Sequence, residues 1–217
     1  QEQRAGAAAA AVAVRGPGAA RLLSLETGKA PAELRVVLLD ILRARGESAS
    51  LPAVRSALRA KDEPVRLAAI RALSAVGRSA VVPDLARLLG SGGAPEKAEA
   101  KRALASLSGA KAMDAVASAI KGAAPEAKVE LIRALAARMS LAHAPTVKAR
   151  ARGEEEQVRI AALEALGILG DGRMVPDLIR LVCGAAPKRQ CTRCCVVAGS
   201  RHRPSWSCRR HHLASAE

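Results

Sequence analysis

A repeat of constant length runs through this chain and limits the folds that are open to it. One apolar position recurs at the same interval in five copies, Leu42, Leu73, Leu104, Leu135 and Leu166. A second position lies earlier in each unit, and the residue after it is proline in four copies, Pro52, Pro83, Pro145 and Pro176. Separate columns that keep one period, here about 31 residues, predict a repeat architecture.

Each unit of the repeat is predicted to contain two helices, A and B. Helix A begins at the apolar–proline step, as at Leu51–Pro52, because proline suits the first turn of a helix. Helix B is typified by Pro64–Gly77, whose apolar residues recur at steps of three and four. Further B helices are expected at 126–138 and 157–169. Gly77 is expected to end its helix in the left-handed conformation.

Stacking of these helices is needed for stability, because single helices of this length are marginal in water. The predicted fold is therefore all-α, an α-solenoid of stacked antiparallel helix pairs over residues 1–183. It has about five full repeats and partial units at both ends. Residues 3–15 fit helix B of a truncated first unit, and the alternative is a signal-peptide core at Ala7–Val14. Since the chain begins with Gln1, we expect a fragment or a processed form.

The C-terminal tail, residues 184–217, differs in composition from the rest. The net charge of +15 divides into +9 for residues 1–183 (28 basic, 19 acidic) and +6 for the tail (7 basic, 1 acidic). The spacing Cys191-x2-Cys194 and Cys208-x2-His211 is that of a four-ligand zinc site. The alternatives are a disordered or non-native tail, such as an out-of-frame translation, and a poorly formed capping helix. We expect no cofactor apart from this possible zinc ion.

The repeats resemble HEAT repeats of the short subclass named after phycobilisome lyases. Segments such as VVPDLARLLGSGGAPEKAEAKRALASL and VRIAALEALGILGDGRMVPDLIRLV carry the resemblance, which covers residues 3–183. It implies a scaffold for protein interactions in which the B helices line a concave face. A lyase-like chromophore chaperone is a further reading, although no cysteine lies within residues 1–182.

One basic position recurs near the start of every helix B: Arg35, Arg66, Lys97, Lys128 and Arg159. A cation there is opposed by the helix dipole, so it needs a compensating charge. Carboxylates lie just upstream of each copy, for example Glu96 and Glu126. The structural interpretation is a ladder of ion pairs that ties one turn to the next. The functional interpretation is a basic stripe for phosphate or an acidic partner.

A second polar position faces the concave surface of the B helices and is the candidate binding site. Its copies are Asp40, Arg71, Arg102, Arg133 and Glu164. The three central arginines could bind nucleic-acid phosphates, or they could lie on a solvated face with no ligand. Without aromatic side chains in the repeats, bases have no platform on which to stack.

These patterns favour a non-catalytic scaffold for protein–protein interaction, part of a longer bacterial protein. We find no nucleophile–base motif and expect no catalytic residue. The alternatives are nucleic-acid binding through Arg71, Arg102 and Arg133, and chromophore chaperoning. No segment reaches the roughly 20 apolar residues that span a bilayer. We expect a cytoplasmic protein, monomeric or part of a larger chain, with an unidentified protein partner.

Overall fold

The structure is a computed structural model, and it describes residues 6, 10–14, 18–107, 110–152, 155–170, 175, 176, 178 and 179. The chain divides into two units, Gln1–Arg173 and Met174–Glu217. Nearly all of the described residues belong to the first unit. The boundary predicted after residue 183 stays a prediction, because the tail lies outside the described residues.

The predicted all-α class is confirmed, because the described residues form helices and turns and no strand. Five A helices alternate with five B helices in this part of the chain. The A helices are α2 (Ala19–Lys29), α4 (Leu51–Ala57), α6 (Val82–Ser91), α8 (Ala110–Ala119) and α10 (Ala144–Arg150). The B helices are α3 (Ala32–Arg45), α5 (Glu63–Gly77), α7 (Ala94–Ser106), α9 (Pro125–Ala137) and α11 (Glu156–Leu169). Three short 3-10 turns, η1 (Ser48–Ser50), η2 (Arg78–Val81) and η3 (Leu141–His143), precede α4, α6 and α10.

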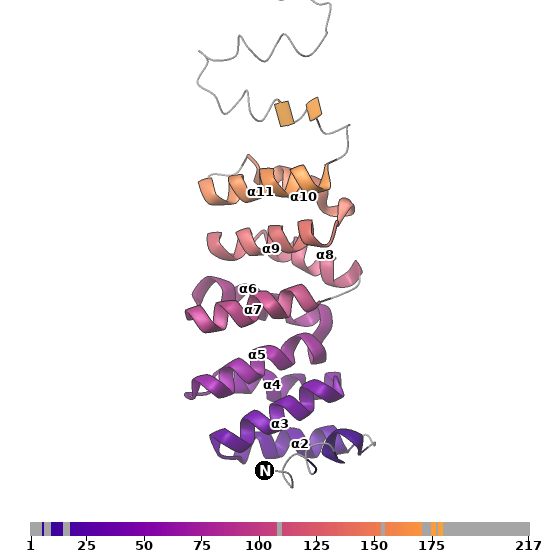
Figure 1. Cartoon of the computed structure of the whole chain (residues 1–217), viewed down its shortest axis with the longest axis vertical. Coiled ribbons are helices and arrows are strands. Elements are labelled where there is room, and N and C mark those ends of the chain that lie inside the picture. Colours follow the sequence, from indigo (N-terminus) through magenta and orange to yellow (C-terminus); the bar gives the residue numbers. More distant parts are fainter. Residues whose placement is uncertain are drawn as a thin grey trace, which may run out of the picture. The chain divides into compact units, whose positions relative to one another are not determined.

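The helix pairs stack in chain order (Figure 1). Each A helix packs on the B helix that follows it, and α3, α5 and α7 pack one on the next, as do α9 and α11. The exception is α9, which contacts α7 at only a few residues and packs more closely on α6. The B helices therefore separate between α7 and α9.

The core lies between the A and B helices and is built from the repeating apolar positions. The leucine column Leu42, Leu73, Leu104, Leu135 and Leu166 is at most 2% exposed. Val54, Leu85, Val116 and Val147 of the A helices are fully buried opposite it. Because the same position is buried in every unit, the apolar residues of the core repeat at a constant interval in the sequence. The period can therefore be recognised although the repeats contain no aromatic residue.

The prediction for Gly77 was wrong. Gly77 has a φ of −107°, and the residue with positive φ is its neighbour Arg78, at 46°. Glycine is needed at position 77 for space instead, since a Cβ there would lie 1.9 Å from Cγ1 of Val81 in η2. Two B helices do end in a left-handed residue, at Gly46 (φ 63°) and at Met139 (φ 50°).

Replacement of Met139 by glycine is expected to stabilise the fold by about 1 kcal/mol, because a left-handed residue with a Cβ is strained. The Ser140 N–H bonds the Leu135 carbonyl at 3.1 Å, so Met139 occupies the position where glycine is preferred. Its side chain is 58% exposed, so little apolar burial is lost. Urea unfolding measures the gain, and Gly46→Ala, the reverse change, should cost a similar amount. A destabilised Met139→Gly variant would contradict this reading of the cap.

In the described part of the chain, no helix has the length and apolar character that crossing a membrane requires.

Candidate functional site

The basic column at the start of the B helices forms ion pairs between neighbouring units. Nε of Arg66 lies 2.6 Å from Oε1 of Glu96, and Nζ of Lys128 lies 3.1 Å from Oε1 of Glu155. Lys97 pairs with Glu126 in the same way. Each cation thus bonds an acid 27 to 30 residues later, in the next unit, rather than the acid just upstream of itself. These three pairs tie four consecutive B helices together.

The two ends of this column differ from its centre. Arg35 donates to the carbonyls of Gly28 and Ala30, at 3.5 and 3.1 Å, instead of to a carboxylate. Asp62 and Glu63 lie 27 and 28 residues after Arg35, but neither pairs with it in the described part of the chain. Arg159 also makes a polar interaction. The arrangement favours the structural interpretation of the column, because its central cations already have carboxylate partners.

The acids of this ladder have lowered pKa values. The hydrogen bond from Arg66 holds the pKa of Glu96 below its ordinary value of 4.5, against the opposing effect of burial. Hydrogen bonds from Lys97 and Lys128 likewise lower the pKa values of Glu126 and Glu155. The three carboxylates therefore stay charged, and paired, to a lower pH than isolated glutamates do.

These pKa shifts predict an acid-labile contribution to stability. Because the pKa values are lower in the folded state, the contribution is complete above pH 4.5 and disappears as the pH falls through the folded values. The triple variant Glu96→Gln, Glu126→Gln, Glu155→Gln should be less stable than the parent at pH 7, and the gap should narrow steadily below pH 4.5. Urea midpoints across this range measure it, with Glu63→Gln as an exposed control. A gap that is independent of pH would refute the ladder.

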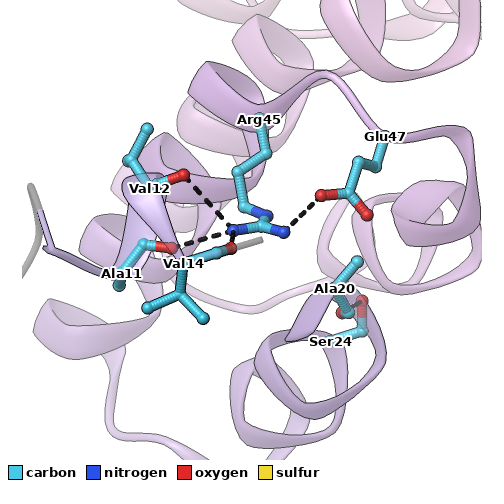
Figure 2. Close-up of polar contacts among 7 residues, drawn as sticks. All are labelled: Ala11, Val12, Val14, Ala20, Ser24, Arg45 and Glu47. Atoms are coloured by element: carbon cyan, nitrogen blue, oxygen red, sulfur yellow. Dashed lines mark hydrogen bonds and ion pairs between the residues drawn. The ribbon is translucent and has the colours of Figure 1, made fainter. Parts of the chain in front are cut away.

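Three other arginines hold the array together in ways that the sequence did not reveal. Arg45, at the end of α3, donates to the carbonyls of Ala11, Val12 and Val14 and forms an ion pair with Glu47 (Figure 2). Arg138, at the same register position three periods later, donates to the carbonyl of Ala105 in the last turn of α7. Arg55 of α4 bonds both the carboxylate of Asp84, at 2.8 Å, and a backbone carbonyl of η2.

The members of the candidate column on the B helices are exposed or half-buried, and the structure does not place them in one site. Arg71 and Arg102 line a groove between α3, α5 and α7, together with Arg43. We call this the arginine groove; its volume is about 430 Å³, and its other lining residues are Ser74, Ala75, Glu99, Ala103 and Ser106. Asp40 pairs with Arg43 at 3.8 Å outside this lining, and Glu164 lies exposed on α11.

Arg133 lines a different groove, which opens where α9 separates from α7. We call it the mixed groove; it has a volume of about 350 Å³. Its floor is apolar, with Leu89 of α6, Val129 of α9 and Ile160 and Ala161 of α11, and its rim is charged, with Lys97, Lys101, Glu126, Glu130 and Arg133. Arg133 and Lys101 both pair with Glu130, at 3.3 and 2.9 Å. The charges of this rim are therefore largely compensated.

A serine, a histidine and an aspartate meet at the start of α10, which the sequence analysis did not foresee. Oγ of Ser140 lies 2.7 Å from Nδ1 of His143, whose Nε2 lies 2.9 Å from Oδ1 of Asp114 in α8. None of the three residues lines the arginine groove or the mixed groove. The chain of bonds links the turn before α10 to the preceding unit, and we assign it this positioning role.

The predicted zinc ligands Cys191, Cys194, Cys208 and His211 lie outside the described residues, so the zinc site stays a prediction. Within the described ranges, no group of three or more His, Cys, Asp or Glu side chains could hold a metal ion.

Of the comparisons with known proteins, the match to a family model agrees with the stacked helix pairs. The family model of HEAT repeats matches residues 19–105. A solved structure of human deoxyhypusine hydroxylase in complex with glycerol is similar over 84% of this chain and 84% of that chain, with 18% sequence identity and a TM-score of 0.38. Similarity at that level says nothing about activity. No curated protein matches the sequence.

Proposed function

We propose that this chain, whose residues 19–105 match the family model of HEAT repeats, is a non-catalytic module that binds a protein partner on the exposed face of its B helices. The observation that carries the proposal is the presence of two grooves, of opposite character, on this one face. An exposed surface that combines aliphatic side chains with charged ones is typical of protein interfaces.

An aliphatic column runs beside the charged column on the same face. Its copies lie four residues before those of the charged column, one turn away on each helix: Val36, Leu67, Ala98, Val129 and Ile160. All of them are partly or fully exposed, and Ile160 is 49% exposed. Since each helix already buries its other face against its neighbours, this column is available to a partner.

Nucleic-acid binding through Arg71, Arg102 and Arg133 is less well supported. Arg102 is paired with Glu99 at 2.8 Å, and Arg133 is paired with Glu130. Carboxylates therefore alternate with the cations along the face. A phosphate backbone would lie against both, which reduces the gain from counterion release.

Site-specific photocrosslinking in the cell of origin tests the proposed face. A benzophenone amino acid at Ala98 or at Arg133, both on the B-helix face, is expected to give the same discrete adduct with a second protein. Matched probes at Arg87 of α6 and at Lys121, which are exposed on the A side of their units, should give none. Adducts of equal yield from all four positions, or none from the B helices, would refute the proposal.

A further inference from the structure

We propose that the arginine groove binds a pair of carboxylates from an extended acidic protein segment, and that the mixed groove takes an aliphatic side chain of the same segment. This inference rests on the proposed function and specifies the partner's chemistry. It distinguishes arginines whose N–H donors bind acceptors within the fold from arginines whose N–H donors remain available to a ligand.

The arginines of the groove leave their hydrogen-bond donors open. The guanidinium of Arg71 makes no hydrogen bond or ion pair within the described part of the chain. Arg43 approaches Asp40 only to 3.8 Å, and Arg102 uses a single nitrogen, on Glu99. By contrast, Arg66 donates to three acceptors, one of them a carboxylate. Each guanidinium carries five N–H donors in a fork that matches a carboxylate.

The floor of the arginine groove suits an extended backbone. It consists of small side chains, Ser74 and Ala75 of α5 and Ala103 and Ser106 of α7. Both hydroxyls donate to backbone carbonyls of their own helices, Ser74 to Arg71 and Ser106 to Ala103. Small residues let a bound chain approach closely, so its acidic side chains can reach the arginines above the floor.

The charge of the groove selects an acidic ligand. Three arginines face one lining carboxylate, Glu99, and Asp40 contacts Arg43 from outside the lining, so the groove keeps a net positive charge. A pair of carboxylates from a partner can accept hydrogen bonds from the N–H donors that these arginines leave open. The basic surface does not continue into the mixed groove, where Lys97, Lys101 and Arg133 are all paired with glutamates. A short acidic cluster therefore fits better than a long, uniformly charged nucleic-acid backbone.

The mixed groove supplies the second contact. Val129 and Ile160 form an apolar floor, and Leu89 is reached only because α9 stands away from α7. Packed helices lie about 8–10 Å apart and α9 stands further than that from α7, so the centres of the two grooves are separated by at least about 16–20 Å. An extended segment rises about 3.3 Å per residue and covers this distance in about five or six residues. The ligand is therefore an acidic pair and an aliphatic residue at that spacing.

Fluorescence anisotropy with the whole chain and a synthetic peptide tests the inference. The peptide carries two adjacent glutamates and, about six residues away, one leucine, in a serine and threonine background. We expect Arg71→Glu to weaken binding at least about tenfold and Ile160→Ser about fivefold. Arg87→Glu, an equal charge change on α6, should change the affinity less than about twofold. Replacement of both glutamates by glutamine in the peptide should reproduce the loss seen with Arg71→Glu.

Three outcomes would overturn the inference. The first is equal weakening of peptide binding by Arg71→Glu and Arg87→Glu, which would indicate general charge attraction. The second is unchanged affinity for the peptide in which both glutamates are glutamine. The third is tighter, Arg71-dependent binding of a single-stranded oligonucleotide of similar length. If crosslinks from Ala98 and Arg133 persist while the peptide fails, the proposed function stands and only the ligand assignment falls. Circular dichroism of each variant confirms that the helices remain.

Discussion

Replacement of Arg45 by methionine is expected to destabilise the array by about 3 kcal/mol, in the range found when one partner of a buried ion pair is removed. The Arg45 side chain is only 4% exposed and contacts three backbone carbonyls at residues 11–14 as well as Glu47. Methionine has a similar length but cannot donate a hydrogen bond. The change therefore leaves one carboxylate and three carbonyls, at the end of the helical segment 10–13, without their donor.

Urea unfolding and hydrogen exchange measure this effect separately. The Val14 amide, bonded to the Ala10 carbonyl at 2.9 Å, should lose its protection before the rest of the chain does. Arg138→Met is the matched control, because Arg138 occupies the same register position but donates to one carbonyl and is exposed. It should cost about 1 kcal/mol. Equal costs for the two variants would mean that Arg45 is not the principal contact that holds the helical segment 10–13.

Replacement of Gly77 by alanine is expected to cost about 1–3 kcal/mol, as overpacking of a close-packed core does. The new methyl group would lie 1.9 Å from Cγ1 of Val81, and Cβ of Val81 lies at 3.3 Å from the same point. Val81 is fully buried and β-branched, so it has no other rotamer into which it can move freely. The clash with the new methyl group must therefore be relieved by a displacement of η2 and of the start of α6.

Thermal or urea denaturation of Gly77→Ala, with Gly122→Ala as control, checks this prediction. A Cβ at Gly122 would meet no atom within 4 Å, so that substitution should be neutral or slightly stabilising. If the Gly77→Ala variant unfolds with the same free energy as the Gly122→Ala variant, η2 does not approach α5 as closely as the structure shows.

The helices could be predicted from the sequence because the same apolar positions must be buried in each of five units. Leu73 must be buried in its unit, and so must its equivalents, so chance variation at one copy does not hide the pattern. The predicted helix 64–76 lies within α5, and 157–169 within α11. Gly77 was misjudged because a buried glycine and a left-handed glycine look the same in sequence.

The candidate site could be predicted only in part, because grooves collect side chains from several columns. Arg71 and Arg102 share a column and a groove, whereas Arg43 belongs to a column one turn away and joins them through α3. Arg133 keeps the register but is separated by the displacement of α9. No periodicity argument reveals a local change in helix packing.

Several ion pairs between units have a constant separation in the sequence, from which they could have been predicted. Arg55–Asp84, Arg66–Glu96 and Lys97–Glu126 are separated by 29 or 30 residues, slightly less than one period. A search for acids at this offset from each cation identifies these three pairs and Lys101–Glu130, but not Lys128–Glu155, whose residues are 27 apart.

The central claim is that the fold occupies Arg45 and Arg66, whereas in the arginine groove it leaves Arg71 unpaired among the described residues and Arg43 and Arg102 with open N–H donors for a partner. Modification of the intact chain with phenylglyoxal, followed by mass spectrometry of its peptides, measures this directly, because the reagent attacks accessible guanidinium groups. Arg43, Arg71 and Arg102 should react at least about tenfold faster than Arg45 and Arg66. Reaction of Arg45 or Arg66 as fast as that of Arg71 would contradict the account.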